Sequence, residues 1–296
     1  MQFTIAGYST ALFATWYFIE ELGLLFDAGD GVIAGLTQKS GKIKHVFISH
    51  ADRDHVTGIL QLNQLNARPG FPKIYYPKDS NSFPALQAFS NRFDPHVVHT
   101  EWHGIDPDTE VHINKEWVVK PIINGHVSTA GELVKSLSYI VYHVKHKLRP
   151  EYAGMPGAEI GRLRKQLGDE AVMQEVREAV LAYSGDTPVE DVTRYKEVQI
   201  LIHEATFLEA DNVEHFNEKP NKHSTLREVI SMASGLGLKC LILGHFSCRY
   251  NDAEIDTAIE TLCAAYKIPF PVYRVLPSRL HTHLLAETPC WKGFGI

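Results

Sequence analysis

The sequence has few cysteines, no long apolar run and no excess of positive charge. Its four cysteines form no Cys-x-x-Cys pair and no secretory signal is recognisable, so we expect reduced thiols in a cytoplasmic protein. No hydrophobic run approaches the roughly twenty residues of a membrane-spanning helix, so we expect no membrane span. The net charge of −6 argues against binding polyanions over the whole surface, but not against a local basic patch or a metal centre that faces phosphate.

The sequence does contain strands and helices in alternation, with polar residues where strands end. A chain of 296 residues that is 44% hydrophobic can bury a large core. The patterning predicts strands at 97–102, 198–202 and near Leu284, and helices at 169–180 and 224–234. Binding sites of open α/β folds lie in the loops beyond strand ends. The polar residues found there are His50, His126, Asp186, His203 and His245.

The segment 47–58 is the densest of these clusters. A short buried strand at 44–49 leads into it, and apolar residues at helical spacing follow from Val56. Two imidazoles and two carboxylates lie between them, namely His50, Asp52, Asp54 and His55. Such nitrogen and oxygen donors suit a borderline metal such as zinc. A solvated polar loop would also tolerate these residues, but later segments supply further candidate ligands.

Six motifs between Asp27 and Tyr250 carry a family resemblance. They are His50-x-Asp52-x-Asp54-His55, His126 followed by Ser138-Tyr139, Tyr183-Ser184-Gly185-Asp186-Thr187, His203-Glu204-Ala205-Thr206, His223-Ser224-Thr225 and His245-Phe246-Ser247-Cys248-Arg249-Tyr250. Together they resemble the metallo-β-lactamase superfamily, and within it the ribonuclease Z branch of tRNA 3′-processing endonucleases. The resemblance implies an αββα sandwich, two β-sheets flanked by helices, as one domain over 1–296. It also implies a homodimer.

The chemistry of these residues can be argued without the name. Two zinc ions about 3.5–4 Å apart can bridge a hydroxide and clamp a phosphoryl oxygen, which takes six or seven ligands and a bridging carboxylate. The candidates are His50, Asp52 and His126 for one ion, Asp54, His55 and His245 for the other, and Asp186 as the bridge. Asp54 is also a candidate acceptor for the proton of the attacking water. Three of these residues also have a structural interpretation: His126 as a core histidine, Asp186 as a helix cap, and His245 as an ordinary strand-end residue.

The leaving alkoxide needs a proton, and a histidine kept charged by a carboxylate can donate it. The candidates are His223 as donor and Glu204 as its partner, although the two residues could also form a structural ion pair. The final histidine motif adds Ser247, Arg249 and Tyr250 as candidate substrate-binding residues.

Three segments depart from the family pattern. Asp52 replaces a histidine of the family pattern. If its carboxylate binds metal, manganese or iron joins zinc as a candidate. If Asp52 points away instead, one ion is held weakly or lost. The segment 7–16 has no Lys or Arg where the family has a basic loop; its aromatic residues Tyr8, Phe13 and Trp16 could stack on bases or pack in the core. The insertion at about 145–168, which in the family holds an RNA-gripping arm, has basic residues offset by acidic ones. We therefore expect a shortened arm or none.

The function that these features favour is metal-dependent phosphodiester hydrolysis. The first hypothesis is endonucleolytic removal of the 3′ trailer of pre-tRNA. The cation-free segment 7–16 motivates a second, hydrolysis of a small phosphodiester such as a cyclic nucleotide. Asp52 alone motivates a third, a non-catalytic binding relative.

Overall fold

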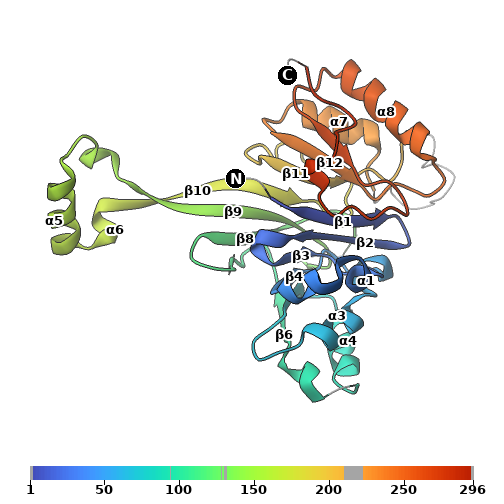
Figure 1. Cartoon of the computed structure of the whole chain (residues 1–296), viewed down its shortest axis with the longest axis horizontal. Coiled ribbons are helices and arrows are strands. Elements are labelled where there is room, and N and C mark those ends of the chain that lie inside the picture. Colours follow the sequence, from blue (N-terminus) through green and yellow to red (C-terminus); the bar gives the residue numbers. More distant parts are fainter. Residues whose placement is uncertain (1–2, 94, 128, 130–131, 210–222, 295–296) are drawn as a thin grey trace.

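Two β-sheets packed face to face form the centre of the molecule (Figure 1). This computed structural model describes the whole chain except residues 1–2, 94, 128, 130–131, 210–222 and 295–296. The strands of the first sheet are β1 (Ile5–Thr10), β2 (Ala14–Ile19), β3 (Leu24–Phe26), β4 (His45–Phe47), β5 (Lys73–Pro77) and β6 (Glu101–Ile105), in that order. Those of the second are β7 (Val111–His112), β8 (Trp117–Ile123), β9 (Leu137–Leu148), β10 (Met173–Tyr183), β11 (Ile200–Glu204), β12 (Cys240–Gly244) and β13 (Val272–Arg274), ordered β13-β12-β11-β10-β9-β8-β7.

The central strands are short apolar runs because both of their faces are covered. Strands β3, β4, β11 and β12 each have a parallel neighbour and are buried along their whole length, and such strands read as continuous hydrophobic segments. Between the sheets, the ring of Phe26 lies 5.1 Å from that of Tyr183, and the ring of Phe47 lies 5.3 Å from that of Tyr139. This aromatic layer holds the sheets in one register, so the loops beyond the strand ends have fixed positions.

Helices cover the outer face of each sheet. Helices α1 (Val32–Leu36), α3 (Ile59–Asn66) and α4 (Ser82–Ser90) contribute to an apolar cluster on the first sheet, and α7 (Leu226–Ser234) and α8 (Asp252–Ala265) to one on the second. Thr225 and Glu228 form a capping box that begins α7, as Asn251 and Glu254 do for α8. The predicted αββα sandwich and the helix predicted at 224–234 are therefore confirmed.

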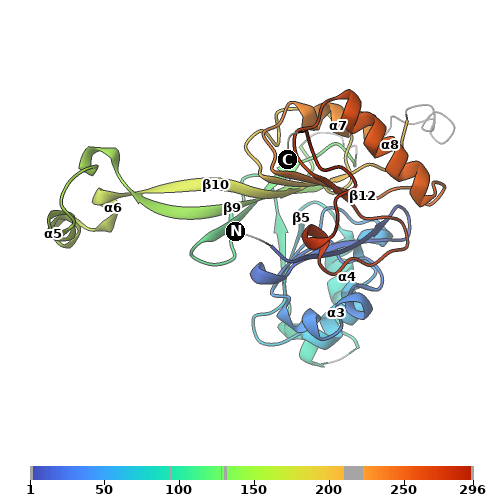
Figure 2. The same cartoon turned by 45° about the horizontal axis from the view of Figure 1, so that its top comes forward.

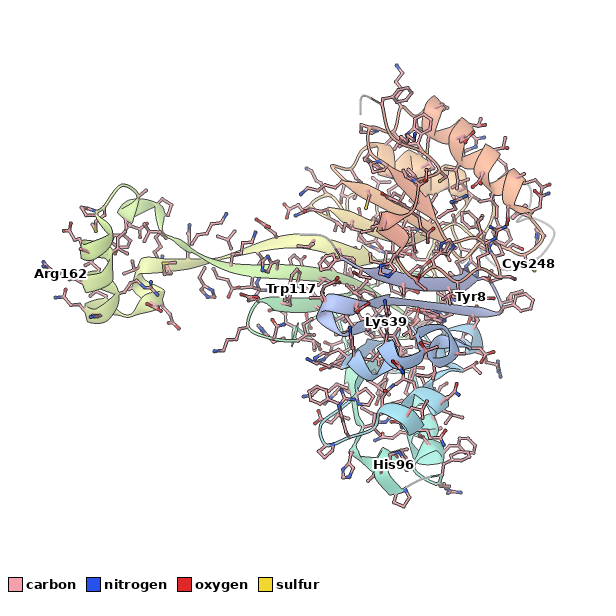
Figure 3. The ribbon with its side chains drawn as sticks, in the orientation of Figure 1. Tyr8, Lys39, His96, Trp117, Arg162 and Cys248 are labelled. Carbon is pink, nitrogen blue, oxygen red and sulfur yellow. The ribbon has the colours of Figure 1, made fainter. Side chains whose placement is uncertain are left out.

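The insertion forms a projecting arm. Strands β9 and β10 leave the sandwich as an antiparallel ribbon that carries a 3-10 helix (Pro150–Tyr152), α5 (Gly157–Leu167) and α6 (Asp169–Val172) at its tip (Figures 1 and 2). Arg162 lies at this tip (Figure 3). The sequence analysis expected a shortened arm or no arm, and the second of these predictions is wrong.

The helix predicted at 169–180 is also wrong beyond Val172. From Met173 the chain pairs with β9, beginning opposite Leu148, and the ion pair between Lys145 Nζ and Glu178 Oε2 (2.7 Å) joins the two strands. This partner lies far away in sequence, and its cross-strand contacts override the local helical spacing.

Two predicted strands are helical turns instead. The 3-10 helix Pro95–His99 takes up the first three residues of the strand predicted at 97–102, and only its last two belong to β6, which begins at Glu101. Leu284–Ala286 is likewise a 3-10 helix. Both segments are too short for periodicity to separate a strand from a buried turn.

Neither a membrane span nor a disulfide occurs among the described residues. No helix there is long and apolar enough to cross a bilayer. The four cysteines, Cys240, Cys248, Cys263 and Cys290, are all free thiols.

Candidate metal centre and active site

The loop after β4 places its first histidine in a fully buried position. The Ser49 hydroxyl lies 2.9 Å from His50 Nδ1, while His50 Nε2 is buried without a hydrogen bond to any described residue. Asp52 Oδ2 lies 3.6 Å from His50 Nε2 and 3.5 Å from His126 Nε2. The neighbouring imidazoles of His126 and His50 hold the pKa of Asp52 well below its ordinary value. Of the two orientations open for Asp52, the structure therefore has the inward one.

A second group forms where α2 (Arg53–Val56) meets the end of β12. Asp54 Oδ2 lies 3.6 Å from His55 Nε2 and 3.4 Å from His245 Nε2. The backbone of His245 has a positive φ of 59°, and its N–H donates to Ser9 Oγ at 2.8 Å. This bond orients the residue as the chain turns at the end of β12.

Asp186 lies between the two groups. Its Oδ2 is 3.8 Å from His50 Nε2 and 3.3 Å from both His55 Nε2 and His245 Nε2. Burial raises the pKa of Asp186, but the imidazoles of His245 and His55 outweigh burial and hold it well below its ordinary value. Gly185 permits the approach, because it has a φ of 58° and an added Cβ would lie 2.7 Å from Ser49 Cβ.

The residues present fit a pair of divalent metal ions. The seven predicted ligands come from segments far apart in sequence, and the ligand atoms within each of three overlapping groups lie within 4.8 Å of one another. Like that of His50, the Nε2 of His55 is buried without a hydrogen bond to any described residue. A buried polar atom without a partner is costly, and a metal ion would satisfy both nitrogens.

The carboxylate of Asp27 orients His55, a role that the sequence motifs did not predict. It is fully buried, and its Oδ2 lies 2.7 Å from His55 Nδ1, so that Nε2 faces the other ligands. The hydroxyls of Ser49 and Tyr183 donate to the same oxygen at 2.8 and 2.5 Å, and the Ser49 N–H donates to Oδ1 at 2.7 Å. The signal in the sequence was a carboxylate directly after the apolar strand β3.

The predicted proton donor and its partner also meet beside these groups. His223 Nδ1 lies 3.1 Å from Glu204 Oε1, and Thr206 Oγ1 donates to Glu204 Oε2 at 2.5 Å. Burial lowers the pKa of His223, but the charge of Glu204 and its hydrogen bond outweigh burial and raise the pKa to about 9. His223 Nδ1 is 3.9 Å from Asp186 Oδ2, so the pair adjoins the metal-ligand groups.

A cavity of about 220 Å³ opens over this centre. Ser247 and Arg249 line it together with Leu12 and Phe207, and the Arg249 guanidinium lies 5.4 Å from the Phe207 ring centroid. Tyr250 is half-buried behind them and its hydroxyl accepts the Leu208 N–H at 3.4 Å. Two of the three predicted substrate-binding residues therefore face the cavity.

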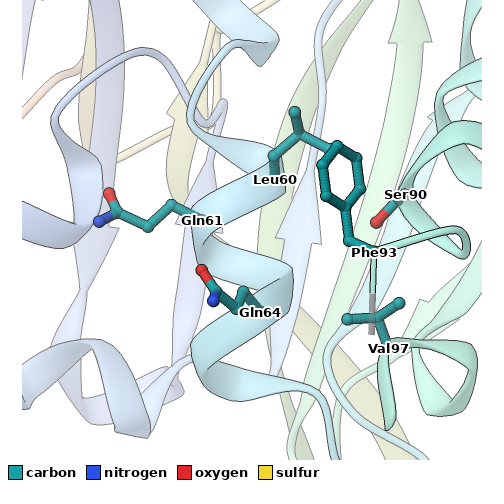
Figure 4. Close-up of a pocket in the computed structure, with 6 residues that line it drawn as sticks. All are labelled: Leu60, Gln61, Gln64, Ser90, Phe93 and Val97. Atoms are coloured by element: carbon teal, nitrogen blue, oxygen red, sulfur yellow. The ribbon is translucent and has the colours of Figure 1, made fainter. Parts of the chain in front are cut away.

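A second cavity, of about 340 Å³, lies apart from the candidate ligands. Leu60, Gln61, Gln64, Ser90, Phe93 and Val97 line it (Figure 4). The described residues that line it are not titratable, so they offer no group for acid–base or metal chemistry. His203 likewise lies outside the ligand groups, with Nδ1 2.7 Å from the Glu204 carbonyl oxygen.

The sandwich and the cluster at its strand ends define a metallo-β-lactamase fold protein. The structure is similar to the metallo-β-lactamase fold protein YhfI from Bacillus subtilis, with a TM-score of 0.64 at 15% identity over 95% of this chain and 99% of that one. It is also similar to the short form of human tRNase Z, with a TM-score of 0.54 at 19% identity over 83% and 93% of the two chains.

Sequence similarity identifies the family. The chain is 32% identical to ribonuclease Z of Methanocaldococcus jannaschii over 277 residues, 84% of each protein. It is 28% identical to tRNase Z TRZ1 of Arabidopsis thaliana over 273 residues, 88% of this chain and 91% of that one. No family model matches the chain. The chain belongs to the ribonuclease Z family.

Proposed function

We propose that this protein is a metal-dependent endoribonuclease that removes the 3′ trailer of pre-tRNA. Its relatives named ribonuclease Z and tRNase Z support this substrate over a small phosphodiester. The observation that carries the proposal is the ion pair of Glu204 and His223 beside the candidate metal ligands. Cleavage of an RNA phosphodiester expels an alkoxide, and a charged histidine at this position can protonate it.

We infer that two divalent ions bind here, zinc first, with manganese or iron as candidates because of the carboxylate at Asp52. The proposed ligands are His50, Asp52 and His126 for one ion, Asp54, His55 and His245 for the other, and Asp186 for both. The ions would supply a nucleophilic hydroxide at neutral pH and stabilise the charge on the phosphoryl oxygens.

Two side chains of this protein move protons in the proposed reaction. Asp54 is kept ionised by His245 and His55 even though burial raises its pKa, so it can accept the proton of the attacking water. The bond from oxygen to phosphorus forms as the bond from phosphorus to the 3′ oxygen breaks, and His223 gives that oxygen its proton. Because Nδ1 faces Glu204, Nε2 would carry the transferred proton. The products are a tRNA with a 3′ hydroxyl and a trailer with a 5′ phosphate.

The arm suits a contact with RNA away from the cleavage site. Arg162 is exposed there, whereas Arg149 donates to the carbonyl oxygens of Met173 and Glu170 and Arg164 is paired with Asp169 at 2.7 Å. We infer, as the family resemblance implies, that the arm grips tRNA and that the protein is a homodimer. We also infer one domain over 1–296, because both sheets share a core.

The test is cleavage of a 3′-extended pre-tRNA by the purified chain loaded with zinc or manganese. We expect one cut that leaves a 3′ hydroxyl on the tRNA, and two metal ions per chain by elemental analysis. A fully loaded protein that leaves this RNA intact while hydrolysing bis(p-nitrophenyl) phosphate would contradict the tRNA assignment and favour the small-substrate alternative.

A further inference from the structure

The turn between β1 and β2 exposes two large apolar side chains, of which Leu12 lines the active-site cavity and Phe13 is the next residue along the chain. Thr10 pairs with Ala14, which leaves a three-residue tip of Ala11, Leu12 and Phe13. The residue exposures at the tip are 87% for Leu12 and 60% for Phe13. By contrast Trp16, another aromatic residue of this segment, is 1% exposed and packs under α1. Base stacking is thus excluded for Trp16 but open to Phe13.

The tip is held against the reaction centre. The Leu12 N–H donates to Asp54 Oδ2 at 3.0 Å, and the Ala11 N–H donates to the Phe246 carbonyl at 3.3 Å. Leu12 also lines the same cavity as His223 and Arg249. Tyr8 and Cys248 both lie on the side of the molecule opposite the tip of the arm, where Arg162 lies (Figure 3).

These residue types are poor choices for the turn itself. Leu12 has a φ of 71°, a region in which glycine or asparagine is far better tolerated. Its side chain gains nothing in the free protein, because it is almost fully exposed. A strained and exposed apolar residue beside an active site is better explained by a ligand than by folding.

We propose that Leu12 and Phe13 contact the nucleobase next to the scissile phosphodiester, with Phe13 as the stacking residue. The inference rests on the proposed ribonuclease function. Asp54 joins the tip to the reaction centre, so a base flanking the cleaved bond is the RNA group within its reach. The segment has no cation to attract phosphate, whereas an aromatic ring holds any base through its π face.

The experiment compares kcat/KM of the metal-loaded wild type with that of Leu12→Ala and Phe13→Ala on pre-tRNA. Phe89→Ala is the matched control, since Phe89 is 52% exposed on α4, away from the cavity. We expect Phe13→Ala to lower kcat/KM about 5- to 100-fold, mostly through KM, with metal content and melting temperature unchanged. Phe89→Ala should match the wild type.

Abasic nucleotides placed one at a time on both sides of the cleaved bond identify the contact. At one position the loss from Phe13→Ala should disappear, because the base that it contacts is already missing. The slope of log(kcat/KM) against log[salt] should not change for Phe13→Ala and should steepen by about 0.7 for Phe13→Lys, which adds a phosphate contact.

Each failure has a separate meaning. Wild type that leaves pre-tRNA uncut contradicts the proposed function and this inference with it. Wild type that cleaves while both tip variants stay within twofold of it contradicts the inference alone. Equal losses on every abasic RNA, or a change in oligomeric state by light scattering, would also overturn it, the latter in favour of a protein contact.

Discussion

Replacement of Asp27 by asparagine tests whether the metal centre depends on a carboxylate that binds no metal itself. Asp27 Oδ2 accepts from the Ser49 and Tyr183 hydroxyls and faces His55 Nδ1, while Oδ1 accepts the Ser49 N–H. Asparagine has the same shape but one acceptor oxygen and one NH₂ donor. In either rotamer the NH₂ group meets a donor, so at least one buried hydrogen bond is lost. His55 keeps only a neutral amide acceptor if the NH₂ takes the Oδ1 position, and loses its acceptor if the NH₂ takes the Oδ2 position.

The expected cost follows from the number of bonds affected. A hydrogen bond to a charged group contributes about 1.5–3 kcal/mol, and a buried donor left unpaired costs about 1–3 kcal/mol. If the NH₂ takes the Oδ1 position, one donor loses its partner; if it takes the Oδ2 position, three donors are affected. We expect a loss of roughly 3–5 kcal/mol in the free energy of unfolding and a 10- to 100-fold loss of metal affinity.

Metal affinity is measured by competition with a chelator, and stability by urea denaturation of the metal-free protein. Asp30→Asn is the matched control, because Asp30 is exposed and lies three residues away; it should leave both quantities unchanged. A destabilised Asp27→Asn with wild-type metal affinity would mean that Asp27 only supports the fold. Wild-type values for both would refute the whole argument.

Three further predictions concern single side chains. His223→Gln should lower kcat for pre-tRNA about 10²- to 10⁴-fold but spare bis(p-nitrophenyl) phosphate, whose nitrophenolate leaves without a proton; equal losses on both substrates would contradict the role as proton donor. Asp52→His should raise the zinc-to-manganese ratio bound from an equimolar mixture, measured by elemental analysis, and an unchanged ratio would show that Asp52 does not set metal preference. Burial and the charges of Lys73 and Lys44 lower the pKa of His45 to about 4. Between pH 6.5 and 4 the unfolded chain therefore takes up a proton that the folded protein does not, so the free energy of unfolding decreases as the pH falls. In the metal-free protein, His45→Phe should reduce the stability lost between pH 7 and 4 by roughly 2–3 kcal/mol, measured by urea denaturation, and the same loss as in wild type would refute this.

The grouping of the candidate ligands was predictable from the sequence because their motifs stand at the ends of apolar strands. Seven side chains named from spacing and chemistry lie together in the structure. Asp27 could not be assigned in the same way, since its role depends on Tyr183, which lies 156 residues away, and on the orientation of His55. A single carboxylate after a strand marks a candidate position, but outside a motif it does not show which histidine it contacts.

Segments whose conformation depends on distant partners were the ones predicted wrongly. Met173–Tyr183 has helical spacing at its start, yet it forms a strand because β9 lies beside it. The exposed tip at Leu12 was not predicted either, because the sequence does not show which apolar side chains of a segment are exposed. Core packing and base stacking both call for aromatic residues, and only the fold separates Trp16 from Phe13.

The inward-facing Asp52 makes the two halves of the candidate metal centre unequal toward solvent. Its side chain is 64% exposed, whereas that of Asp54 is 11% exposed. An ion held partly by Asp52 would therefore meet water and competing chelators directly, while its neighbour stays enclosed. We expect chelation to proceed in two kinetic phases, with the ion at Asp52 released first and the enclosed ion retained by a half-loaded protein.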